Sequence, residues 1–90
     1  MPVTVRIPSP LRPLTGGAST VECEPGTVRD VIDQLEGRHA GFAERVMKDG
    51  SLRRFVNVFV AGQDVRFAQG IDTPVGDGQE VTILPAVAGG

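Results

Sequence analysis

The last five residues, AVAGG, carry the feature best suited to chemistry. Gly89 and Gly90 have no side chains, so a carboxylate at this end is unhindered toward nucleophiles and toward the phosphorus of ATP. A segment without Cβ atoms also passes through a narrow channel that side chains would block. Five residues follow Pro85, and fully extended they reach about 17 Å from the folded body. The Gly90 carboxylate is therefore the candidate reactive group, and an inert tail is the alternative.

The other reactive side chains do not form a recognisable catalytic set. Cys23 and His39 are the single cysteine and the single histidine, so neither a disulfide nor a zinc site is expected. Cys23 has no base near it in sequence and is expected to be a buried or edge thiol. His39 is expected to be solvated, and Asp30, Asp33 and Glu36 to lie on the outer face of a helix. We expect a protein that is not an enzyme, with no metal or cofactor of its own.

Composition excludes several classes of partner. The chain has 90 residues, of which 40% are hydrophobic and 22% charged, as in a single globular domain. A net charge of −2 gives no electrostatic footprint for nucleic acid or an anionic membrane. The opening MPVTVRIPSP lacks the basic and apolar regions of a signal peptide, and no apolar run approaches the roughly 20 residues that span a bilayer. We expect a cytoplasmic location.

The elements that must position the tail begin with a hairpin and a helix. Alternating apolar residues predict strands at residues 3–7 and 18–24, joined by a long loop over 8–17. A helix is expected to begin after Thr27 as N-cap and to end at Gly37. One apolar stripe follows from its helical spacing, formed by Val28, Val31, Ile32 and Leu35.

The second half of the chain predicts the rest of a sheet. Residues 42–47 suggest a short helical turn and residues 48–51 a loop. FVNVFV, residues 55–60, is the strongest predicted strand, and residues 62–64 are expected to turn it into a short edge strand over 65–67. After a turn-rich connection over residues 70–80, the last strand covers 81–84. The order ββ-α-ββ-β is an α+β fold, a mixed sheet crossed on one face by one main helix.

Pleating assigns the side chains of these strands to two faces. The helix-covered face is predicted to hold Val3, Val5, Ile7, Val56, Val58, Val60, Val81 and Ile83. The opposite face is predicted to hold Thr4, Arg6, Phe55, Asn57, Phe59, Thr82 and Leu84. Phe59 and Leu84 have two interpretations: a loop such as residues 8–17 covers them, or they form an apolar patch that docks a partner.

These features together resemble the ThiS/MoaD-type sulfur carriers, which have the ubiquitin-like β-grasp fold. The resemblance covers essentially the whole chain and rests on the N-terminal hairpin, the single amphipathic helix, FVNVFVAGQDVRF and the ending VTILPAVAGG. LRRFVN and DVRF look most like the CysO-type carriers of cysteine biosynthesis. The resemblance implies a β-grasp domain over residues 1–85 and a flexible tail over residues 86–90.

The resemblance also implies a mechanism. An E1-like adenylyltransferase/sulfurtransferase would adenylate the Gly90 carboxylate, and a sulfur donor would convert it to a thiocarboxylate. A PLP-dependent O-phosphoserine cysteine synthase would accept the sulfur, and a zinc peptidase would release cysteine. ATP, PLP and zinc would belong to these partners, and the free carrier would be a monomer. Gly89 would keep the tail narrow, and partners would bind at Phe59, Leu84, Val87 and Ala88.

Three alternatives stay open for the function of the tail. The same sulfur chemistry would serve molybdopterin or thiamine thiazole synthesis, because the ending P-x-V-x-G-G is shared with MoaD-type carriers. A ubiquitin-like modifier would instead join Gly90 to lysines of target proteins. The third alternative is a β-grasp binding module whose tail is inert.

Overall fold

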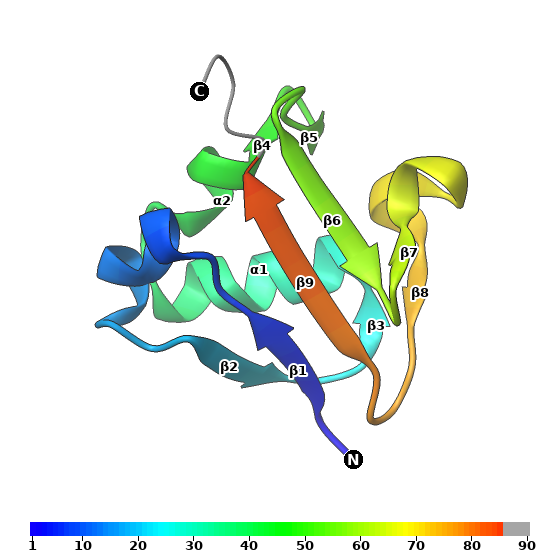
Figure 1. Ribbon diagram of the computed structural model, residues 1–90, viewed down its shortest axis with the longest axis horizontal. Helices are drawn as coiled ribbons and strands as arrows, with labels where there is room; N and C mark the ends of the chain where they lie inside the picture. The colour runs from blue at the N-terminus through cyan, green and yellow to red at the C-terminus, as the bar shows by residue number, and fades with distance from the viewer. Residues whose placement is uncertain (86–90) are drawn as a thin grey trace.

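The central sheet has five strands in the order β2-β1-β9-β6-β7, in a computed structural model that describes residues 1–85 (Figure 1). β1 (Val3–Arg6) pairs antiparallel with β2 (Thr20–Cys23). β9 (Glu80–Pro85) runs parallel to β1 and antiparallel to β6 (Val56–Val60), so the last strand lies at the centre of the sheet. The predicted mixed sheet is confirmed.

The tail predictions fall outside the part of the chain that the structure describes. These predictions are the flexibility of residues 86–90 and the roles of Val87, Ala88, Gly89 and Gly90. They therefore stay predictions. Pro85, expected to follow the last strand, is instead its final described residue and pairs with Val56. Proline has no N–H to donate to a neighbouring strand, so this position suits it only at the end of a ladder.

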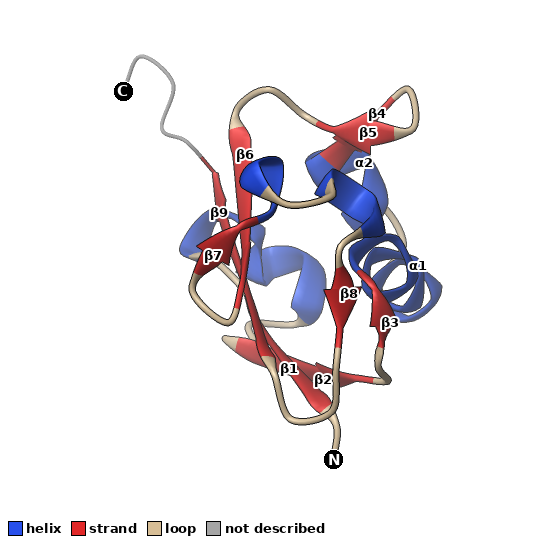
Figure 2. Ribbon diagram, turned by 90° about the vertical axis from the view of Figure 1, so that its right-hand side faces the viewer, coloured by secondary structure: helices blue, strands red, loops and turns tan. Residues whose placement is uncertain are grey.

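One long helix covers one face of the sheet, as predicted. α1 (Val28–Arg38) lies across that face (Figure 2) and buries its four-residue apolar stripe. Thr27 begins it through a capping box: Thr27 Oγ1 accepts from the Asp30 N–H at 3.2 Å, and Asp30 Oδ2 accepts from the Thr27 N–H at 2.9 Å. These reciprocal bonds satisfy two helix-terminal donors.

The predicted end of this helix at Gly37 is wrong. α1 continues to Arg38, and the left-handed backbone appears at Gly41, whose φ is 94°. The carboxylate of Glu36 accepts the N–H groups of Gly41 and Ala43, which begin α2 (Phe42–Val46). A side chain on the last turn of α1 therefore organises the start of the next helix, and Gly37 is not needed for the turn.

The predicted edge strand over residues 65–67 is also wrong. Val65–Phe67 is a 3-10 helix, η2, and the edge strand is β7 (Gln63–Asp64), where a turn was expected. The turn itself is Ala61–Gly62, because Val60 pairs with Gln63. Asp64 Oδ1 accepts the Arg66 N–H at 2.8 Å, which caps the helical turn and ends the strand.

The predicted loops contain short regular elements. The loop over residues 8–17 includes the 3-10 helix η1 (Ser9–Thr15), which buries Leu11 and Thr15. The 48–51 segment is the turn of a hairpin between β4 (Met47–Lys48) and β5 (Ser51–Leu52). The 70–80 connection holds the 3-10 helix η3 (Gly70–Asp72) and β8 (Pro74–Val75), and β8 pairs with β3 (Gly26–Thr27).

The core lies between α1 and the predicted inner face of the sheet. All eight residues assigned to that face are buried: Val3, Val5, Ile7, Val56, Val58, Val60, Val81 and Ile83. Phe42 from α2 is fully buried and joins the same cluster. Because these side chains come from β1, β6 and β9, packing against α1 fixes the strand that leads into the tail.

Candidate functional site

The candidate site is the tail root, which we define as Leu84 and Pro85 at the end of β9. Leu84 pairs with Asn57 and Pro85 with Val56, so β6 supports the strand to its last described residue. β1 pairs with β9 only from Glu80 to Thr82. The tail root is therefore held on one side and open on the other.

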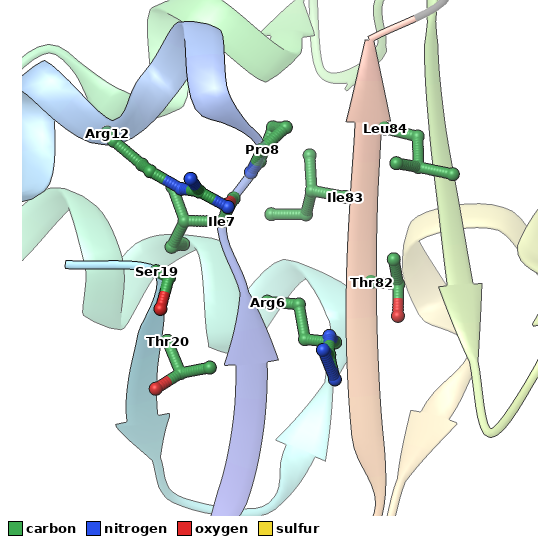
Figure 3. A pocket seen from close by; sticks show the side chains of 9 residues that line it. All are labelled: Arg6, Ile7, Pro8, Arg12, Ser19, Thr20, Thr82, Ile83 and Leu84. Atoms are coloured by element: carbon green, nitrogen blue, oxygen red, sulfur yellow. The ribbon is translucent and has the colours of Figure 1, made fainter. Parts of the chain in front are cut away.

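A small pocket of about 170 Å³ occupies the open side (Figure 3). After β1 the chain enters η1, whose N-cap is Pro8, and no longer runs beside β9. The Nε of Arg12, in η1, donates a hydrogen bond to the Ile7 carbonyl at 3.1 Å. Figure 3 shows Ile83 and Leu84 projecting from opposite sides of β9. Leu84 thus borders both this pocket and the outer face of the sheet.

The outer face carries the predicted pair Phe59 and Leu84. Leu84 is 46% exposed, and Phe59 is half-buried and lies outside the buried core cluster. Pro8 and Arg12 line the same pocket as Leu84, yet nearly half of the Leu84 side chain stays exposed, so residues 8–17 do not cover it. Phe55, predicted to begin this strand, lies in the turn just before β6 and is 54% exposed. These observations favour the interpretation of the pair as an exposed apolar patch at the tail root.

Polar groups surround this patch. Arg6 on β1 forms an ion pair with Glu80 on β9, with 3.3 Å between Nη1 and Oε2. Asn57, which faces Leu84 across the ladder, accepts a hydrogen bond at Oδ1 from Arg66. An apolar centre with a polar rim is the usual arrangement of a protein–protein interface.

Arg66 fixes the segment that leads into β6. Its Nη2 donates to the carbonyls of Arg53, Arg54 and Val56 at 3.0, 3.1 and 2.7 Å. Val56 is the pairing partner of Pro85, so the guanidinium holds the backbone that supports the tail root. This role of Arg66 is not predictable from the sequence. Only the tertiary fold brings η2 under residues 53–57, and DVRF by itself carries no such signal.

Cys23 and His39 are not brought together with the tail root. Cys23 is buried, and burial raises the pKa of its thiol, an effect that the Arg38 guanidinium opposes only in part. Burial and a raised pKa both make a thiol a weaker nucleophile. His39, expected to be solvated, is half-buried as the C-cap of α1.

Within residues 1–85, no three of the His, Cys, Asp and Glu side chains are placed so that they could hold a metal ion. Among the same residues, no helix is long and apolar enough to span a membrane.

Comparison with known proteins places this geometry in a family. A sequence model of the ThiS family matches residues 5–90. The sulfur carrier protein CysO of Mycobacterium tuberculosis (strain ATCC 25618 / H37Rv) is 50% identical over 93 aligned residues, covering 100% of both chains. Small archaeal modifier protein 3 of Haloferax volcanii is 39% identical over 67 residues, which cover 74% of this chain and 73% of that protein.

The fold agrees with solved structures of the same group. A chain in the crystal structure of the Amycolatopsis orientalis BexX/CysO complex superposes with a TM-score of 0.94 and 52% identity, covering 98% of this chain and 99% of that chain. The β-grasp fold expected from the sequence is confirmed. The match to the family model includes the final glycine pair as well as the sheet that supports it. The chain therefore belongs to the ThiS family.

Proposed function

We propose that this chain is a sulfur carrier that holds sulfur as a thiocarboxylate on Gly90 and delivers it to cysteine biosynthesis in the cytoplasm. The observation that carries the proposal is the match of the ThiS family and of CysO through the glycine pair that follows the central strand. In this role the chain is a protein co-substrate, and the enzymes are its partners.

The chemistry explains why a carrier needs no catalytic side chain of its own. A free carboxylate is a poor electrophile, so one Gly90 oxygen first attacks the α-phosphorus of ATP and pyrophosphate leaves. A sulfur donor then attacks the acyl carbon and AMP leaves, which forms the thiocarboxylate. Gly89 and Gly90 give the partner access to this carbon because neither has a Cβ.

The activating partner in this proposal is an E1-like adenylyltransferase that grips the patch of Phe59 and Leu84. The patch adjoins the tail root, so docking there aims residues 86–90 into the enzyme. Val87 and Ala88 would then contact the walls of the enzyme's channel that admits the tail. The Amycolatopsis CysO occurs in a complex with BexX, which supports a carrier that works by binding another protein.

The acceptor in this proposal is a PLP-dependent cysteine synthase that uses O-phosphoserine. The thiocarboxylate sulfur bonds to Cβ of the serine unit, phosphate leaves, and a zinc peptidase later releases cysteine from the adduct. Incubation of the loaded carrier with the synthase and O-phosphoserine tests this step. We expect the intact mass of the product to exceed that of the unloaded, carboxylate form of the carrier by one cysteine residue, because the sulfur of that residue is already on the loaded carrier. If the thiocarboxylate instead stays unreacted, the result favours the alternative in which the carrier supplies sulfur for molybdopterin or thiamine thiazole synthesis.

A second candidate is a ubiquitin-like protein modifier. The 39% identity to small archaeal modifier protein 3 of Haloferax volcanii favours it. In this case the activated Gly90 would form an isopeptide bond with lysine side chains of target proteins. Proteolysis of the host proteome would then yield lysine residues that carry a remnant of the tail, whereas a dedicated sulfur carrier yields none.

A further inference from the structure

A second surface adjoins the tail root, on the side of the β4–β5 hairpin. A groove of about 610 Å³ lies between this hairpin, the end of α2 and the segment that leads into β6. Four cationic side chains line it, from Arg45, Lys48, Arg53 and Arg54, together with a single acidic residue, Asp49. Figures 1 and 2 both place the hairpin at the same end of the molecule as the end of β9.

The charge of this groove is not neutralised within residues 1–85. The ion pairs of that part of the chain are Met1–Asp77, Arg6–Glu80 and Arg29–Asp72, all outside the groove. Arg53 donates from Nε to the carbonyl of Glu44 at 2.7 Å, which fixes its guanidinium without cancelling its charge. A chain with nine cations and a net charge of −2 thus gathers four of those cations around one groove.

The groove is continuous with the tail root. Val56 lines it and pairs with Pro85, so one residue belongs to both surfaces. Phe55 adds an apolar wall and is 54% exposed. Arg66 holds the carbonyls of Arg53, Arg54 and Val56, so the backbone that presents these side chains is fixed before any partner binds.

We infer that this groove receives an acidic segment of the enzyme that activates the tail, an inference that rests on the proposed function. Arginine presents a planar fork that matches a carboxylate, and a cluster of cations accelerates encounter with an acidic surface. A long polyanion such as RNA fits less well, because the rest of the chain is net negative and would repel it. The occupant is therefore a short acidic protein segment.

The test compares two variants that each lose two positive charges, at different places on the surface. K48Q/R54Q removes groove cations whose side chains form no hydrogen bond within residues 1–85, and R29Q/R38Q removes two cations of α1 as the control. Thiocarboxylate formation is measured with the cognate activating enzyme, ATP and sulfide, at about 0.05 M and about 0.5 M salt. The distance over which surface charges interact is several times shorter at the higher salt concentration. Thermal melts verify that both variants are folded.

We expect K48Q/R54Q to raise KM for the carrier about tenfold at low salt, with kcat changed less than about twofold, because rim charges act on encounter. High salt should raise the KM of the wild-type carrier, so that the KM values of wild type and K48Q/R54Q come closer together. R29Q/R38Q should stay within about twofold of wild type.

Equal KM values for K48Q/R54Q and R29Q/R38Q would overturn the inference while leaving the sulfur-carrier function intact. Failure of the wild-type chain to form a thiocarboxylate would instead count against that function. Single-stranded RNA is the second probe. RNA that competes with the enzyme for wild type, and not for K48Q/R54Q, would show that the groove takes nucleic acid and that the acidic-segment inference is wrong.

Discussion

Phe59 and Leu84 lie diagonally across neighbouring strands on the uncovered face of the sheet. Phe59 is opposite Thr82 and Leu84 is opposite Asn57, so the two side chains share a face two residues apart in register. Diagonal neighbours of this kind are about 7–8 Å apart, within reach of one partner surface. Leu84 belongs to both the patch and the tail root, so the two surfaces are continuous.

The first prediction concerns this pair. F59A and L84A should each raise KM for loading by the activating enzyme about fivefold to thirtyfold, as loss of an interface side chain worth about 1–2 kcal/mol would. Their melting temperatures should stay near that of wild type. F42A is the contrast, because Phe42 is fully buried and its removal should cost about 3–5 kcal/mol of stability. A stability loss of that size in F59A would mean that Phe59 serves the core.

The second prediction concerns Arg66. R66K keeps the charge but cannot bridge the carbonyls of Arg53, Arg54 and Val56. We expect a loss of about 0.5–1.5 kcal/mol in the free energy of unfolding, because exposed and part-buried carbonyls exchange a charged, planar donor for water. Amide hydrogen exchange should rise in β6 near Val56 more than in β2. Unchanged exchange at β6 would show that the lead-in segment does not depend on this guanidinium.

The third prediction concerns acid stability. Backbone N–H groups of Ala43 and Gly41 donate to the Glu36 carboxylate and hold its pKa below the ordinary value of 4.5. The unfolded chain therefore binds the proton more tightly than the folded one. The stabilisation is complete above the ordinary pKa and is lost as the pH falls through the lower, folded-state pKa.

E36Q should consequently show a smaller fall in melting temperature than wild type between about pH 5 and pH 3. E44Q is the matched control, since the Glu44 carboxylate accepts no hydrogen bond within residues 1–85, and its profile should follow that of wild type. If the E36Q profile also follows wild type, the contacts of Glu36 contribute nothing to acid stability.

The fourth prediction concerns Cys23. C23A should accept sulfur on Gly90 as efficiently as wild type, because the buried thiol has a raised pKa and lies on β2, which β1 separates from β9. Its stability should fall by about 0.5–3 kcal/mol, as for a buried side chain made smaller. In the native protein, iodoacetamide should alkylate Cys23 only after denaturant is added. Loss of sulfur loading in C23A would give the thiol a part in the chemistry.

The sequence predicts the faces of this fold better than its connections. The alternation of Val56, Val58 and Val60 with Asn57 and Phe59 determines which side chains are buried, since a strand has period two whatever its neighbours. The nature of residues 65–67 depends instead on Asp64, whose side chain caps a helical turn. Local patterns do not reveal such a contact, so they predict an edge strand at residues that form a 3-10 helix.

The tail root illustrates the same division. The ending VTILPAVAGG indicates the reactive group, because its lack of side chains is visible in the sequence. The groove of Arg45, Lys48, Arg53 and Arg54 is not visible in the same way. Its cations come from α2, β4 and the lead into β6, and only the hairpin between β4 and β5 brings them together.

Intact-mass spectrometry of the carrier after incubation with its activating enzyme, ATP and sulfide tests the central claim most directly. We predict that the mass of wild type rises by the difference between a sulfur and an oxygen atom, and that fragmentation places the change on Gly90. A chain lacking Gly90, and one with a residue appended after it, should show no change. An unchanged wild-type mass, or a mass shift on any other residue, would contradict the account.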